Sequence, residues 1–151
     1  DRLGMTARLD TIQAAILLAK LDVFDDELKQ RAYVANYYHE LLSDWVQTPV
    51  CYSDITSSWA IYTLNLPKSV DRGNMQESLS KNGIPTAIYY PIPMHLQKPY
   101  ERFPRAKFGL EVSERLAQTV LSIPMHPYLE RKAQLTISNA IIEVVKTSGS
   151  N

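Results

Sequence analysis

Cysteine is almost absent from this sequence, because Cys51 is the only one in 151 residues. A disulfide within the chain is therefore impossible, which fits the reducing environment of the cytoplasm and makes a cytoplasmic location the expectation. The lone cysteine and three widely separated histidines also lack the spacing of a zinc site. We expect no metal ion.

An excess of charge and a long apolar run are missing as well. Sixteen basic residues balance sixteen acidic ones, so no net charge attracts nucleic acid or an anionic membrane. No apolar stretch approaches the roughly 20 residues of a membrane span. The first residues also lack the basic and apolar regions of a signal peptide. Neither nucleic acid nor a membrane is expected as a partner.

Glycine is scarce, with five residues that never form a phosphate-binding loop of the Gly-x-x-x-x-Gly-Lys type. The Gly-x-Ser-x-Gly turn that holds the nucleophile of serine hydrolases is absent too. These absences argue against nucleotide triphosphate hydrolysis and serine hydrolase chemistry. The acidic clusters are interpreted as solvated helix faces.

The segment from Asp10 to Ser43 has the apolar spacing of a helix and contains no proline or glycine. One continuous helix of this length would extend roughly 50 Å at 1.5 Å per residue, which is longer than a compact domain of this size. We expect that it either kinks near Leu21–Asp22 or projects toward a partner. The acidic residues that follow this point suit the first turn of a second helix.

The remaining sequence alternates strand-like and helix-like segments. Strands are predicted at 58–66, 86–90 and 119–123, and helices at 71–82, 110–118 and 129–146, with a loop at 96–108. The prediction is an α+β fold: a long N-terminal helix and then a small domain of about three antiparallel strands with helices on one face. We divide the chain into a long helical segment (1–44), a small α+β domain (45–147) and a frayed tail (148–151).

Two motifs attract attention. In Thr6-Ala7-Arg8-Leu9-Asp10, Thr6 or Asp10 can cap a helix, which is the structural interpretation. The functional interpretation uses the same helix N-terminus as an anion site, to which Arg8 adds a planar charged fork.

The second motif is Tyr89-Tyr90-Pro91-Ile92-Pro93-Met94-His95. It can simply be an aromatic strand end that two prolines turn. In a strand, however, Tyr89 and Tyr90 would point to opposite faces, so that one packs while the other presents its hydroxyl to a cavity.

These motifs, the run Leu9-Asp10-Thr11-Ile12-Gln13-Ala14-Ala15 and the segments 85–97 and 121–129 together resemble the C-terminal part of a DegT/StrS-type aminotransferase. This family consists of fold type I enzymes that use pyridoxal phosphate (PLP) to aminate nucleotide-linked keto-sugars, among them enzymes of surface-polysaccharide synthesis. The resemblance implies the small C-terminal domain of such an enzyme. It also implies a homodimer, a nucleotide-sugar substrate and an N-terminal PLP domain that this chain does not contain.

The resemblance also suggests site residues. Thr6 stands where the family pattern Gly-x-Asn-x-Arg has asparagine, and that residue contacts the PLP phosphate of the partner subunit. Arg8, Tyr89, Tyr90 and His95 match positions that border the substrate. Tyr89 replaces a frequent histidine or arginine and so removes a potential cation.

A PLP aminotransferase needs a lysine that forms a Schiff base with the cofactor. None of the lysines here occupies the family's lysine motif, so we expect no catalytic residue, no cofactor bound by this chain alone and no activity by itself. A PLP-dependent dehydratase remains an alternative parent. Another class of function also stays open, namely a stand-alone dimerisation or ligand-binding module, or a piece that supplies Thr6 and Arg8 to a separate chain.

Overall fold

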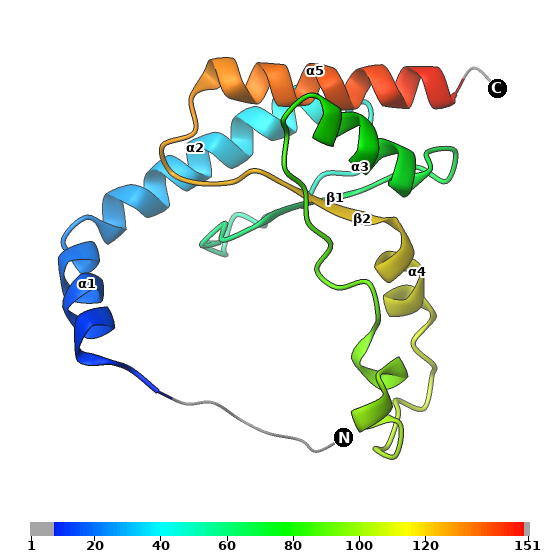
Figure 1. Ribbon diagram of the computed structural model, residues 1–151, viewed down its shortest axis with the longest axis horizontal. Coiled ribbons are helices and arrows are strands. Elements are labelled where there is room, and N and C mark those ends of the chain that lie inside the picture. Colours follow the sequence, from blue (N-terminus) through cyan, green and yellow to red (C-terminus); the bar gives the residue numbers. More distant parts are fainter. Residues whose placement is uncertain (1–7, 150–151) are drawn as a thin grey trace.

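The structure is a computed structural model that describes residues 8–149 (Figure 1). Its helices and strands follow in the order α1 (Thr11–Leu21), α2 (Phe24–Leu42), β1 (Tyr62–Asn65), α3 (Arg72–Lys81), the short 3-10 helices η1 (Met94–Leu96) and η2 (Lys98–Tyr100), α4 (Glu111–Thr119), β2 (Val120–Ile123) and α5 (Arg131–Ser148).

The two strands form an antiparallel sheet at the centre of the fold. Their register runs from the pair Tyr62–Ile123 to the pair Asn65–Val120. Side chains alternate between the two faces of a strand, so every second residue points to the same side. The residues that share the buried face are Tyr62, Leu64, Leu121 and Ile123, all at most 4% exposed.

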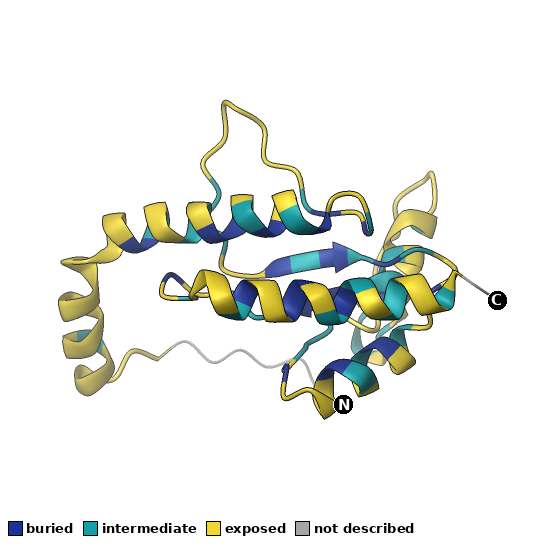
Figure 2. Cartoon of the chain, turned by 90° about the horizontal axis from the view of Figure 1, so that it is seen from above, coloured by how far each residue is buried: buried dark blue, intermediate teal, exposed yellow. Residues whose placement is uncertain are grey.

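Helices α2, α3 and α5 cover this face of the sheet (Figure 1). Buried positions recur along the sides of α2 and α5 that face inward (Figure 2). Full burial of one leucine such as Leu64 stabilises the fold by about 1.5–3 kcal/mol. A polar contact also fixes how α5 lies against α2, since Gln134 Nε2 on α5 donates to the Val34 carbonyl of α2 at 2.9 Å. Burial of this one face therefore holds three helices in place.

The prediction of three strands is wrong in detail, because the third is reduced to one bridge between Ala87 and Ser122. These two residues exchange both backbone hydrogen bonds, at 2.8 and 3.0 Å. Pro85 has no N–H to extend the pairing on one side. Beyond Ala87 the chain leaves the sheet and runs toward Pro91. A second bridge, Gln47–Asn65, flanks the opposite edge of the sheet.

The prediction of one long N-terminal helix is also wrong. The chain does change direction near Leu21–Asp22 as expected, but it does so through a complete break in the helix. Helix α1 ends at Leu21 and α2 begins at Phe24. The first turn of α2 contains Asp25, Asp26 and Glu27, where acidic side chains interact favourably with the helix dipole. The charge pattern therefore marked the start of a second helix.

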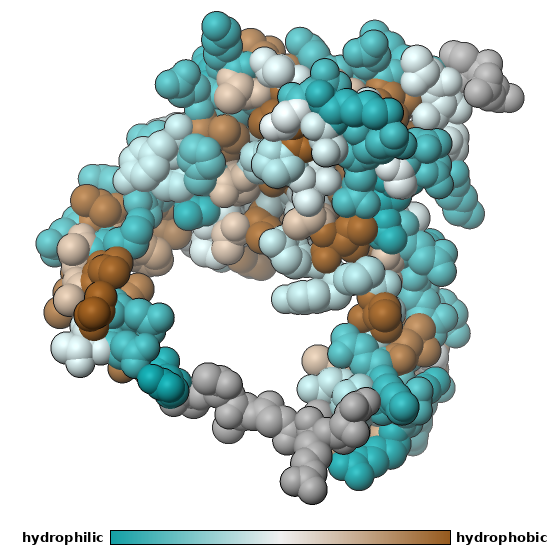
Figure 3. All heavy atoms as spheres, in the orientation of Figure 1, coloured by the Kyte–Doolittle hydropathy of each residue, from teal (hydrophilic) through white to brown (hydrophobic). Residues whose placement is uncertain are grey.

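Helix α1 contributes nothing to the core, and none of its residues is buried. Hydrophobic side chains gather over this helix (Figure 3). Those exposed on it and around it include Leu9, Ile12, Ile16, Leu17, Leu18, Leu21, Val23 and Phe24. Within residues 8–149, no helix combines the length and apolar character that crossing a membrane requires.

Glu27 connects the α1–α2 junction to the rest of the fold. Its carboxylate accepts a hydrogen bond from the Tyr128 hydroxyl at 2.8 Å and one from Lys20 Nζ on α1 at 3.2 Å. The side chain of Glu27 is 10% exposed. The bond from Tyr128 and the bond and charge of Lys20 together lower the pKa of Glu27. Through these two bonds Glu27 links α1 to the loop that precedes α5.

We predict that Glu27→Gln removes part of the pH dependence of stability. A carboxyl group with a lowered folded-state pKa stabilises the fold above its ordinary value of 4.5 and loses this effect as the pH falls through the folded value. The melting temperature of the wild type should thus fall more than that of the variant as the pH is lowered from above 4.5 to well below that value, and the two should run in parallel at higher pH. Glu143→Gln, at an exposed position of α5, is the control. An equal difference between wild type and E27Q at every pH would contradict the role given to the carboxylate.

Candidate functional site

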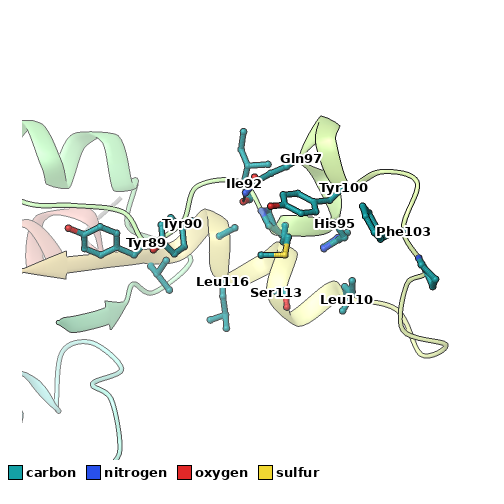
Figure 4. A pocket seen from close by; sticks show the side chains of 15 residues that line it. Tyr89, Tyr90, Ile92, His95, Gln97, Tyr100, Phe103, Leu110, Ser113 and Leu116 are labelled. Carbon is teal, nitrogen blue, oxygen red and sulfur yellow. Dashed lines mark hydrogen bonds between the residues drawn. The ribbon is translucent and has the colours of Figure 1, made fainter. Parts of the chain in front are cut away.

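The candidate site is a cavity of about 950 Å³ between the segment 89–104 and helix α4 (Figure 4). This volume lies within the range of small-molecule sites in proteins. The residues that line it are Tyr89, Tyr90, Ile92, Pro93, Met94, His95, Gln97, Tyr100, Phe103, Pro104, Leu110, Ser113, Leu116, Ala117 and Val120.

One wall is a face of α4. Leu110, Ser113, Leu116 and Ala117 recur at three- and four-residue spacing, which places them on one side of a helix. The helix runs into β2 without a loop, because α4 ends at Thr119 and β2 starts at Val120. This wall is consequently built directly onto the core strand.

Arg72 on α3 secures the carboxyl end of α4. Its guanidinium donates to the carbonyl oxygen of Ala117 at 2.6 Å and to that of Val120 at 3.3 Å. The last carbonyl groups of a helix have no partner within the helix, so these bonds satisfy groups that would otherwise need water. Arg72 thereby ties the α4 wall to the helical layer.

The other wall is the segment 89–104, which the loop prediction for 96–108 covered in part. Pro91 and Pro93 prevent strand pairing here because they lack the N–H that a sheet requires. Short turns take its place: Leu96 N donates to the Pro93 carbonyl at 3.0 Å, and Tyr100 N donates to the Gln97 carbonyl at 2.8 Å. These turns form η1 and η2.

His95 joins the two walls. Its Nε2 lies 3.0 Å from Glu114 Oε1 on α4, and the side chain of His95 is only 12% exposed. The backbone carbonyl of His95 also accepts a bond from Arg105 Nη2 at 3.3 Å. His95 thus holds the segment 89–104 against α4.

Tyr89 and Tyr90 do not point to opposite faces of a strand as expected. Their ring centroids lie 5.7 Å apart with an interplanar angle of 69°, an edge-to-face contact. The physical reason is that the chain is no longer part of the sheet beyond Ala87. Both rings stay accessible, since Tyr89 is 47% exposed and Tyr90 is 72% exposed.

The structure brings Tyr89, Tyr90 and His95 together at one cavity but does not bring Arg8 to it. Arg8 precedes α1, and its Nη2 forms an exposed ion pair with Asp10 Oδ1 at 3.1 Å. Asp10 does not cap α1 through its side chain, although its carbonyl accepts the Ala14 N–H at 2.9 Å. Thr6 lies outside the described residues.

The sequence reasoning missed much of the cavity. It assigned no binding role to Tyr100 and Phe103, whose rings lie 6.1 Å apart, or to the apolar face of α4. The helical spacing of Leu110, Ser113 and Leu116 was a usable signal. It indicates an apolar face but not that this face borders a cavity rather than the core.

The cavity wall carries little charge. Among the described residues that line it, none is lysine, arginine, aspartate or glutamate. No group of three His, Cys, Asp or Glu side chains gathers as a metal site anywhere in the described part of the chain. The arrangement suits a ligand with an apolar or aromatic body and a few neutral polar groups.

Residues 1–142 match the model of the DegT/DnrJ/EryC1/StrS aminotransferase family, and the chain belongs to this family. A relative from Pseudomonas aeruginosa, UDP-2-acetamido-2-deoxy-3-oxo-D-glucuronate aminotransferase, is 42% identical over 85% of this chain and 34% of its own length. A dTDP-3-amino-3,6-dideoxy-alpha-D-galactopyranose transaminase from Aneurinibacillus thermoaerophilus is 32% identical over 91% of this chain and 37% of its own length. The chain therefore spans about a third of the length of these curated relatives.

Solved structures support the same fold. The chain is similar to a crystal structure of a DegT DnrJ EryC1 StrS aminotransferase from Brucella abortus, with 42% identity and a TM-score of 0.83 over 93% of this chain and 37% of that one. It is also similar to S. venezuelae DesV in complex with ketimine intermediate, with 30% identity and a TM-score of 0.82 over 97% of this chain and 39% of that one. The mixed helical fold with a small antiparallel sheet is thus that of part of an aminotransferase.

We predict that Glu114→Ala loosens the loop wall. The substitution removes the partner of His95 Nε2, so the turns of η1 should open more often. Hydrogen exchange at the Leu96 and Gln97 amides, which bond to the carbonyls of Pro93 and Met94, should become faster.

Glu143→Ala on α5 is the matched control and should leave these two amides unchanged. Equal exchange at Leu96 and Gln97 in the wild type and the Glu114 variant would show that the contact between His95 and Glu114 does not hold the walls together.

Proposed function

We propose that this chain is the C-terminal part of a PLP-dependent aminotransferase that transfers an amino group, with glutamate as donor, to a nucleotide-linked keto-sugar. The match of residues 1–142 to the aminotransferase family carries the proposal. The names of the relatives from P. aeruginosa and A. thermoaerophilus, which refer to UDP- and dTDP-linked sugars, support this substrate class.

The described residues do not fit PLP by themselves. An aminotransferase holds PLP through a lysine, and no lysine lines the cavity. Several lysines have other contacts: Lys20 bonds Glu27, Lys29 bonds Asp26 and Lys81 bonds Glu77. In this proposal the chain supplies no catalytic step of its own, and the rest of the enzyme holds the cofactor.

The chain's own contribution is recognition. Arg8, exposed before α1, would meet an anionic part of the substrate, and Thr6 would reach the PLP phosphate of a partner subunit in a homodimer. Tyr89, Tyr90 and His95 border the cavity on the small domain. In this proposal α1, which buries none of its residues here, belongs with the helical segment 1–44 that packs on the PLP domain, while residues 45–147 form the small domain.

A chimera tests the proposal. In it the chain replaces the corresponding third of the P. aeruginosa relative, and the assay is amination of the keto-sugar nucleotide in that enzyme's name. We expect turnover, and we expect Arg8→Ala to lower kcat/KM by about tenfold or more, the effect of losing one hydrogen bond to a charged group of about 1.5–3 kcal/mol. Lys29→Ala, which removes another exposed cation, is the control.

A folded chimera that shows PLP absorbance without turnover would contradict the proposed function. The isolated chain gives a second readout. After incubation with PLP and borohydride reduction, its intact mass should show no adduct on a specific lysine, and a stoichiometric adduct would overturn the assignment of the cofactor to the rest of the enzyme.

The second candidate function is a stand-alone dimerisation module, and the exposed apolar surface of α1 favours it. Apolar patches of this kind mark interaction surfaces. If two copies pair through α1, Ile16→Glu at a 57% exposed position should convert a dimer into a monomer in sedimentation velocity, because a charge would be buried in the contact. Val50→Glu, at a 72% exposed position away from α1, should leave the dimer intact. A monomer at all concentrations in the wild type would refute this function.

A further inference from the structure

A second cavity, of about 600 Å³, lies where α2, β1 and α4 each end. Arg115 and Thr119, one helical turn apart, line it from one side of α4, whereas Leu116 and Ala117 line the cavity described above from another side. Among the described residues, none that the proposed function uses lines this second cavity. We propose that it binds a phosphate ester whose organic part carries hydroxyl groups.

Two cations of this cavity are unpaired. The Arg115 guanidinium and the Lys68 ammonium form no hydrogen bond or ion pair with any described residue. Lys146 adds positive charge at the edge, since its Nζ lies 4.8 Å from the centroid of the Trp45 ring, which also lines the cavity. The planar fork of arginine can bind two phosphate oxygens at once, and lysine adds a point charge. The cations therefore suit a phosphate dianion.

The dipole of α4 does not account for Arg115. A positive charge is stabilised by the carboxyl end of a helix only within the last turn. The last turn of α4 contains no basic residue, and Arg115 precedes that turn. An exposed cation in this position is therefore available to a ligand.

A row of hydrogen bonds fixes a neutral donor beside these cations. Thr119 Oγ1 on α4 donates to Asn65 Oδ1 on β1 at 2.6 Å, and Asn65 Nδ2 donates to Gln47 Oε1 at 2.6 Å. Gln47 and Asn65 also exchange two backbone hydrogen bonds, at 2.9 and 3.2 Å. Since the carboxamide oxygen of Gln47 is occupied, its Nε2 remains as an oriented donor on the cavity wall. Such a donor can bind a phosphate oxygen without a further ordering cost.

Asp44 indicates what the rest of the ligand carries. It is the acidic residue among the described residues that line this cavity, and it forms no ion pair with them. A carboxylate repels a second anionic group but accepts hydrogen bonds from alcohols. The cavity volume also lies in the range of small-molecule sites, which leaves room for an organic part beside the phosphate. The ligand class is therefore a hydroxylated phosphate ester.

Titration of the isotope-labelled chain at constant ionic strength, followed by NMR, tests the inference. At about pH 7.5 a phosphate monoester is mainly a dianion. We expect glycerol 3-phosphate to shift the side-chain resonances of Gln47, Trp45 and Arg115, and glycerol to leave them in place. No shift with glycerol 3-phosphate at about 20 mM would overturn the inference, since even a millimolar site would be nearly full there. Equal shifts with glycerol would overturn it as well.

Charge-matched substitutions locate the site. Arg115→Gln and Lys68→Gln, both at exposed positions, should each weaken the binding of glycerol 3-phosphate at least about tenfold, because each removes a charged donor. Lys132→Gln removes an exposed cation of α5 outside the cavity and should change the affinity by less than about twofold at this ionic strength. Equal weakening by all three variants would show that binding reflects overall charge, and would overturn the site.

Methyl phosphate, which has the same phosphate but no hydroxyl group, tests the role of Asp44. It should bind at least about threefold more weakly than glycerol 3-phosphate, because it lacks the hydrogen bond to the carboxylate. Asp44→Ala should remove this difference. If Asp44 only repels anions, the variant binds both esters more tightly and their ratio stays unchanged, which would overturn the assignment of a hydroxylated ligand.

Discussion

Burial of one face of a two-stranded sheet is the constraint on which the rest of this structure depends. Four residues of β1 and β2 meet the inner sides of α2, α3 and α5, and two strands alone would not be stable without such a cover. Because β2 is continuous with α4, burial of Leu121 and Ile123 also sets where α4 lies. The cavity wall is therefore anchored in the core, although it lies at the edge of the fold.

The apolar surface of α1 and the one beside α4 differ in kind. Helix α1 has no buried residue, and its exposed apolar side chains suit contact with a large complementary surface. The surface beside α4 is concave, aromatic and bordered by neutral polar groups, which suits a small molecule. Glu27, held by Tyr128 and Lys20, stands at the junction that relates the first surface to the small domain. Under the proposed function, one chain would thus contribute both an assembly surface and part of a substrate site.

Local patterns were informative wherever a segment's structure depends on its own residues. The helices at 71–82, 110–118 and 129–146 were predicted within two residues at each end, since apolar spacing, the Asp71 cap and Gly83 act locally. The prediction of a strand at 86–90 failed, because a strand needs a hydrogen-bonded partner along its length. The prolines that follow turn the chain away from the sheet. The observed strand Tyr62–Asn65 is shorter than the predicted strand 58–66 for a related reason, since only these four residues pair with β2.

The sequence by itself determined the family, the helical segments, the break region near Leu21 and the lack of a lysine in the expected motif. It also named Tyr89, Tyr90 and His95, which prove to share one cavity. Only the tertiary structure decided that Tyr100, Phe103 and the face of α4 complete that cavity, and that His95 faces Glu114. The reason is physical: residue spacing reports which side chains share a face, but a cavity needs two such faces, and the distance between them is set by how distant segments pack.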